Sequence, residues 1–162
     1  MLEQEIASAM KFIIGNSGNP APYYYEVPQD FVVPAVYFPQ PEIESRGDTL
    51  ATYALEYTWF VKFFHKDTQS AFALGFDVLT ALKYFKNIIP RIDETGKLTG
   101  RSFRMRDPAL KPIDSGAVQL TLMWDSARPY FEQKSQKMMK FKAFMYIKSA
   151  FDGAVTQLKN GG

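Results

Sequence analysis

The chain has 162 residues and no cysteine, which excludes disulfide bonds, thiolate metal ligands and a cysteine nucleophile. Its length suits one domain, which we take to span residues 1–162, and its formal net charge of +2 makes no overall demand for a nucleic-acid partner. Aromatic residues make up 15% of the chain, so large side chains are available both for a core and for contact surfaces.

Neither a secretory signal nor a membrane anchor is expected. The first residues include Glu3 and Glu5, where a secretory signal would be basic. No apolar run reaches the roughly 18 residues that a membrane-spanning helix needs. We therefore expect a protein that is made in the cytoplasm of its host cell and has no membrane partner.

The N-terminal part of the chain predicts one helix and two strands. Apolar residues recur at helical spacing over Leu2–Ile14, and Gly15 is expected to end this helix. After a turn-rich loop, Tyr23–Val27 and Phe31–Phe38 have the composition of strands. Pro34 indicates a bulge or an edge position, because proline cannot donate a hydrogen bond to a neighbouring strand.

The central part of the chain predicts an exposed loop and a long strand. Glu42–Asp48 is polar and is expected to be the loop. Leu50–Phe64 alternates between apolar and more polar residues, which is typical of a strand with one buried face. The residues expected to face the core are Tyr53, Leu55, Tyr57, Trp59, Val61 and Phe63.

A second helix is expected after this strand. Lys66, Asp67 and Thr68 supply an N-cap, and the helix should end just before Pro90. The apolar stripe expected to pack against the sheet consists of Phe72, Phe76, Leu79, Leu82 and Phe85.

Beyond this helix, the chain predicts a charged turn over Asp93–Gly100, a short strand over Arg101–Asp107 and a loop over Pro108–Gly116. Ala117–Asp125 alternates again and predicts a strand. Residues 139–148 fit either a strand or a helix, and their alternation favours the strand.

These elements predict an α+β fold in a single two-layer domain. Their order is about α-β-β-β-α-β-β, with a possible further strand at the end. Short links between the early strands and the long strand favour antiparallel pairing, and two main helices can cover one face of the mostly antiparallel sheet.

The sequence offers no catalytic motif. Its one histidine, His65, lies at a strand end without the convergent ligands that a metal site needs. The chain also lacks a Gly-x-Ser-x-Gly turn, a phosphate loop and a dinucleotide-binding glycine pattern. We therefore expect no catalytic residues, no metal, no cofactor and no enzymatic activity.

Charged residues cluster in three places and form the candidate assembly surface. The clusters lie in the predicted loop, around the short strand and in the lysine-rich C-terminal part of the chain. The candidate residues are Glu42, Glu44, Arg46, Arg101, Arg104, Arg106, Lys140 and Lys142. Such basic clusters suit solvated faces, an acidic partner or a nucleic acid.

Three segments carry a resemblance to a known family. An N-terminal helix leads into Tyr23–Phe31 (YYYEVPQDF) and Val33–Phe38 (VPAVYF), and a long aromatic strand and a helix precede Gly116–Trp124 (GAVQLTLMW). In these segments and in the order of its elements, the chain resembles the tail terminator, or tail completion, proteins of tailed bacteriophages and phage-derived particles.

The resemblance implies a structural protein of the virion tail or neck, assembled in the host bacterial cytoplasm. It implies a homohexameric ring that caps the tail tube, stops its polymerisation and joins it to the head–tail connector, with DNA passing through the ring. Two alternatives remain open. The chain could be another neck or tail component, such as a connector or a tube subunit, or a soluble module that binds a peptide or nucleic acid.

Overall fold

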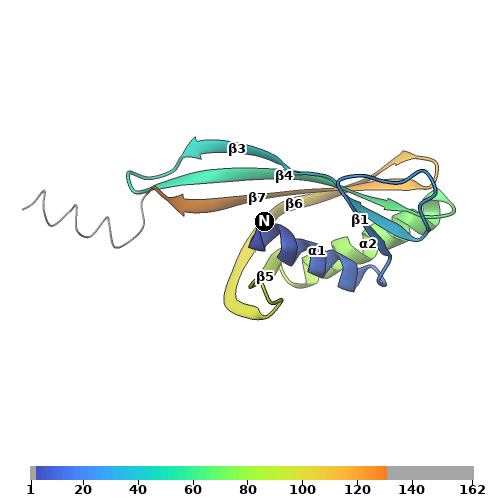
Figure 1. Cartoon of the computed structure of the whole chain (residues 1–162), viewed down its shortest axis with the longest axis horizontal. Helices are drawn as coiled ribbons and strands as arrows, with labels where there is room; N and C mark the ends of the chain where they lie inside the picture. The colour runs from blue at the N-terminus through green and yellow to red at the C-terminus, as the bar shows by residue number, and fades with distance from the viewer. Residues whose placement is uncertain (1–2, 131–162) are drawn as a thin grey trace, which may run out of the picture. The chain divides into compact units, whose positions relative to one another are not determined.

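The computed structural model describes residues 3–130 (Figure 1), which contain two helices and seven strands. In chain order they are α1 (Gln4–Asn16), β1 (Ala21–Tyr24), β2 (Ala35–Phe38), β3 (Glu42–Gly47), β4 (Thr52–Phe64), α2 (Thr68–Tyr84), β5 (Ile88–Ile92), β6 (Leu98–Asp114) and β7 (Ala117–Pro129). The predicted element at residues 139–148 lies outside the described residues.

The strands form one mixed sheet in the order β1-β2-β4-β7-β6-β5, and β3 also pairs with β4. β1 runs parallel to β2, whereas the β2–β4, β5–β6 and β6–β7 pairs are antiparallel. α1 packs against β5 and α2 against β6, and both helices lie on the same face of the sheet (Figure 1). The predicted α+β fold, with helices covering a mostly antiparallel sheet, is therefore confirmed.

The chain divides into two compact units. Among the described residues, the larger unit comprises residues 3–46 and 54–126, and the smaller comprises residues 47–53 and 127–130. Within the smaller unit, the backbone N–H of Tyr130 donates to the carbonyl of Ala51 at 3.1 Å, and the Tyr53 and Tyr130 rings are 5.4 Å apart. A single domain over residues 1–162 stays a prediction.

The alternation of β4 places the core as expected over most of the strand. Tyr57, Trp59, Val61 and Phe63 are buried, together with alternate residues of β7 from Val118 to Trp124. At the start of β4, Leu55 is partly buried and packs against the core as predicted. The prediction is wrong at Tyr53, which is only partly buried, and Ala54 on the opposite face is buried. Alternation gives the direction of a side chain, but burial also depends on the neighbours that cover it.

The cap of α2 is confirmed, but its predicted apolar stripe is largely wrong. The Asp67 side chain accepts a hydrogen bond from the Ser70 backbone N–H at 2.7 Å. The helix ends at Tyr84, well before Pro90, which lies in the unpredicted strand β5.

Small residues form much of the buried face of α2. The buried residues are Ala71, Gly75, Val78 and Leu82, whereas Phe72, Phe76 and Phe85 are exposed. A Cβ atom at Gly75 would lie 2.6 Å from a methyl group of Leu110 on β6. The helix thus comes close to the sheet through its small residues, and this turns the phenylalanines outward.

Two of the predicted loops consist largely of strand residues. Glu42–Asp48 contains β3, and every residue of that strand is exposed, so no apolar alternation marks it in the sequence. Pro108–Gly116 largely belongs to β6, in which Pro108 and Pro112 lie at or beside shifts in the pairing with β7. Such irregularities let a strand tolerate a residue that cannot donate to its neighbour.

The remaining boundaries differ by a few residues. α1 continues through Gly15 and ends at Asn16, and the hydroxyl of its C-cap residue Ser17 donates to the Ile13 carbonyl at 2.6 Å. Pro34 directly precedes β2, and its carbonyl accepts a hydrogen bond from the Ala21 N–H at 3.0 Å. The charged turn lies between β5 and β6 and is shorter than predicted, because β6 begins at Leu98. Within it, the N–H of Asp93 donates to the Lys97 carbonyl at 2.8 Å.

Candidate assembly surface

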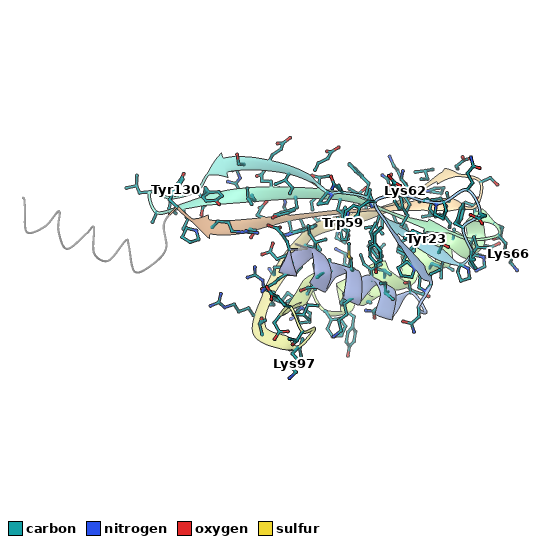
Figure 2. The ribbon with its side chains drawn as sticks, viewed as in Figure 1. Tyr23, Trp59, Lys62, Lys66, Lys97 and Tyr130 are labelled. Carbon is teal, nitrogen blue, oxygen red and sulfur yellow. The ribbon has the colours of Figure 1, made fainter. Side chains whose placement is uncertain are left out.

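The sheet has an outer face that points away from α1 and α2. On this face β4 contributes Glu56, Thr58 and Lys62, and β7 contributes Met123 and Asp125, all partly or fully exposed. Figure 2 shows the side chains on both faces of the sheet, with Trp59 and Lys62 of β4 on opposite faces.

Four charged side chains form a ladder across four strands of the outer face. Arg46 of β3 pairs with Glu56 of β4, and its Nη2 lies 3.7 Å from Asp125 Oδ2 of β7. Asp125 Oδ1 in turn lies 3.1 Å from Arg106 Nη2 of β6. This charge ladder brings together two predicted residues, Arg46 and Arg106, through an aspartate between them.

The sequence prediction did not include Glu56 or Asp125 among the candidate residues. Both lie on the polar sides of strands whose alternation was clear, and that was the available signal. Their carboxylates balance the two arginines, so the charge ladder contains two positive and two negative groups. Exposed ion pairs of this kind add little stability individually, and here they connect Arg46 of β3 with acids on β4 and β7.

The structure does not bring the other predicted charges into the ladder. Glu42 and Glu44 are exposed on β3, and Arg101 and Arg104 are exposed on β6. None of these four side chains forms an ion pair with another residue in the range 3–130. Lys140 and Lys142 lie outside the described residues.

The aromatic residues near β1 attach the loop over residues 25–34 to the sheet. The Phe31 ring lies 5.1 Å from that of Phe64 on β4 and 6.3 Å from that of Tyr23 on β1. The Tyr23 hydroxyl accepts a hydrogen bond from the Val32 N–H at 3.0 Å, and the Tyr37 hydroxyl donates to the Tyr25 carbonyl at 2.9 Å. Part of the tyrosine run therefore has a structural role.

A buried carboxylate attaches the start of α1 to the sheet. Glu5 accepts hydrogen bonds from Trp124 Nε1 at 3.0 Å and from the Ser126 hydroxyl at 2.9 Å, and Arg91 Nη2 lies 3.5 Å away. Glu3 accepts a hydrogen bond from the Tyr57 hydroxyl. These contacts satisfy a buried charge, as burial requires, and they position the helix over the core.

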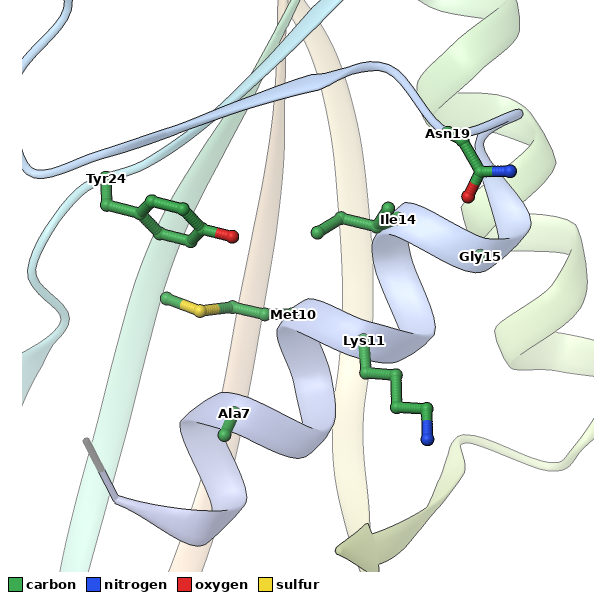
Figure 3. A pocket seen from close by; sticks show the side chains of 7 residues that line it. All are labelled: Ala7, Met10, Lys11, Ile14, Gly15, Asn19 and Tyr24. Atoms are coloured by element: carbon green, nitrogen blue, oxygen red, sulfur yellow. The ribbon is translucent and has the colours of Figure 1, made fainter. Parts of the chain in front are cut away.

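A hollow of about 590 Å³ lies beside α1 (Figure 3). Its lining is mostly apolar and consists of Ala7, Met10, Lys11, Ile14, Gly15, Asn19 and Tyr24. Lys11 donates to the carbonyl of Gly96 at 3.0 Å. The hollow contains no carboxylate, histidine or cysteine, so its lining offers no acid–base pair.

His65 lies at the end of β4, as expected. Its Nδ1 accepts a hydrogen bond from the Lys66 backbone N–H at 2.8 Å. Within residues 3–130, no three His, Cys, Asp or Glu side chains are grouped so that they could hold a metal ion. No helix in that range is long and apolar enough to cross a membrane.

Comparison with known proteins relates this chain to bacteriophage proteins. No protein-family model matches the chain. It is 29% identical over 139 residues to the phage-like element PBSX protein XkdJ of Bacillus subtilis (strain 168), covering 86% of this chain and 94% of XkdJ. It is also 34% identical over 124 residues to the uncharacterized protein YqbJ of the same strain, covering 75% of this chain and 84% of YqbJ.

These matches define the chain as a bacteriophage-related protein. More narrowly, it belongs to the family that contains YqbJ.

Proposed function

We propose that this chain is a structural protein of a phage or phage-derived particle and acts as the terminator of its tail. In this role it forms a hexameric ring on the last turn of the tail tube and stops the addition of further tube subunits. The ring then provides the joint to the head–tail connector and leaves a passage for DNA. The proposed location is the virion tail or neck.

The match to XkdJ is the observation that carries the proposal. XkdJ is a protein of a phage-like element, and the match extends over 94% of its length. The elements on which the resemblance to tail terminators rests, from α1 through the tyrosine run and the long aromatic strand to α2, are present in that order, with β3 as an additional strand. The finer role as a terminator comes from that resemblance.

The exposed charges are physically compatible with an assembly role. A ring needs two different, mutually complementary surfaces on each subunit, because its contacts are heterologous. The described chain has exposed acids on β3 and exposed arginines on β6. We also propose that the protein works without catalysis or a cofactor, by contacts with itself, with the tube protein and with the connector.

Copy number and position in purified particles test this role. A terminator is expected as a single ring at the end of the tail that meets the head, which cryo-electron microscopy of particles can resolve. The tube protein, quantified in the same particles, is the internal reference for a component present in many copies. A copy number close to that of the tube protein would instead identify a tube subunit, and absence from particles would exclude a structural role in the virion.

A further inference from the structure

Two pairs of exposed charges outside the ladder have opposite signs and lie on opposite sides of the sheet. The charge ladder of Arg46, Glu56, Asp125 and Arg106 is balanced internally. On the β3 side it leaves Glu42 and Glu44, which we call the acidic pair. On the β6 side it leaves Arg101 and Arg104, which we call the arginine pair.

The sheet topology separates these two pairs. β3 pairs with β4, and β7 lies between β4 and β6, so the pairs belong to strands on opposite sides of the β4–β7 centre. Glu42 and Glu44 alternate with exposed Ile43 and share the face of β3 that carries Arg46. On β6, Met105 is buried, so alternation turns its neighbour Arg104 to the outer face. Arg101 is exposed three positions earlier, beside the register shift in the β5–β6 pairing.

The geometry points to a second copy of this chain as the partner of both pairs. We propose that the acidic pair of one copy contacts the arginine pair of the next copy, in a head-to-tail contact. A symmetric two-fold contact through either pair alone would place like charges together, whereas a head-to-tail contact places the acidic pair against the arginine pair. This inference rests on the proposed function, because it identifies the subunit contact that the ring requires.

The contact joins side chains and does not continue the sheet from one copy to the next. On the β6 side, Pro90, Pro108 and Pro112 interrupt the donors that an added strand would need. On the β3 side, β4 is the one strand with which β3 pairs among those described, and all six residues of β3 are exposed. The acidic pair is thus accessible to the long arginine side chains of a neighbour.

Charge reversal of each pair, followed by mixing, tests the contact in the full chain. The acid-reversed variant carries Glu42→Lys and Glu44→Lys, and the arginine-reversed variant carries Arg101→Glu and Arg104→Glu. We expect each variant alone to self-associate at least ~30-fold more weakly than the wild type, because like charges then face each other. Sedimentation velocity over a concentration series measures this change.

An equimolar mixture of the two variants should associate again. In the mixture, the lysines of one variant face the glutamates of the other, and the unchanged pairs also remain complementary. We expect the affinity to return to within about 3-fold of the wild type and to weaken as salt rises. A mixture that associates no more tightly than its components overturns the inference.

Matched control variants carry the same changes in net charge elsewhere on the surface. Glu26→Lys with Asp30→Lys matches the acid reversal, and Lys86→Glu with Lys97→Glu matches the arginine reversal. All four positions are exposed. If the controls weaken association as much as the test variants, net charge explains the effect and the contact is wrong.

The test separates this inference from the proposed function. A wild-type chain that stays monomeric at every concentration contradicts the contact, while tail length in particles still decides whether the protein is a terminator. Conversely, a successful charge exchange together with normal tails in the absence of the protein would support the contact and reject the terminator role.

Discussion

Glu5 is the residue that most directly connects the first helix to the sheet. Glu5 is 119 positions from Trp124 in the sequence, yet its buried carboxylate accepts a hydrogen bond from the indole N–H of Trp124 at 3.0 Å. No periodicity in the sequence could predict this contact, because it depends on where the complete fold places β7. The sequence predicted the helix and the strand but not the polar contact between them.

Replacing Glu5 with alanine should destabilise the protein. The Glu5→Ala variant removes the acceptor of Trp124 and one acceptor of Ser126, and it leaves Arg91 without its carboxylate partner. We expect the free energy of unfolding, measured by urea denaturation, to fall by about 2–4 kcal/mol. The exposed Glu94→Ala variant is the control, with a change within about 0.5 kcal/mol. Equal stabilities for the two variants would contradict the role assigned to Glu5.

Gly116 permits the close approach of the β6–β7 turn to the end of β4. Its φ is +70°, and a Cβ atom there would lie 2.6 Å from the backbone oxygen of His65. We expect Gly116→Ala to lower the free energy of unfolding by about 2–4 kcal/mol, through both backbone strain and this collision.

Gly18→Ala is the matched control for Gly116→Ala. Gly18 also has a positive φ, of +78°, but a Cβ atom there would meet nothing within 4 Å. The control variant therefore carries the backbone cost alone. In thermal melts of both variants, Gly18→Ala should have the higher melting temperature. A Gly116→Ala variant as stable as Gly18→Ala would show that the turn moves away from His65 at no cost.

At the scale of elements, the sequence predicted those whose burial follows their own periodicity. β4 and β7 alternate because one face of each packs beneath the helices, so both strands were predicted with nearly the right bounds. β3 was missed because all of its residues are exposed, and β5 was missed because Pro90 was taken as the end of a helix. Edge strands of this kind form through pairing with a neighbour, which a single segment does not reveal.

α2 illustrates a different limit of sequence patterns. Phe72 and Phe76 lie at helical spacing and look like a core stripe, but they are 39% and 51% exposed. The helix instead packs through Ala71 and Gly75, which allow close approach to the sheet. The size of apolar side chains was therefore a poor guide to the buried face of this helix.

The N-cap of α2 should make the stability of the protein depend on pH. Hydrogen bonds from the backbone and side chain of Ser70 lower the pKa of Asp67 below its ordinary value of 3.8. Because the folded-state pKa is lowered, the ionised cap contributes stability above pH 3.8 and loses it as the pH falls through the folded-state pKa.

Two variants of Asp67 separate capping from charge. Asp67→Ala should lower the melting temperature at neutral pH, and its difference from the wild type should shrink as the pH falls below 3.8. Asp67→Asn keeps a capping side chain without the titrating group, so it should retain part of the stability and lose the pH dependence. A constant difference between wild type and Asp67→Ala across this pH range would exclude the ionised cap.

At the scale of the whole molecule, the described residues combine a helix-covered sheet face with an open, charged one. The sequence predicted this two-layer arrangement and several of the charges, but not the charge ladder that pairs Arg46 and Arg106 through Asp125. That pairing depends on the neighbours of each strand in the sheet. Arg46 and Arg106 are paired in this way. Arg101 and Arg104, which we propose contact a second copy, form no ion pair with another residue in the range 3–130.

Tail length in the absence of the protein tests the central claim most directly. The gene should be deleted from its phage or phage-like element and tail lengths measured by electron microscopy, with the gene restored in trans as the control. The terminator role predicts tails that extend beyond the wild-type length with a broad distribution, and a return to one length on complementation. Tails of normal, uniform length in particles that lack the protein would contradict it.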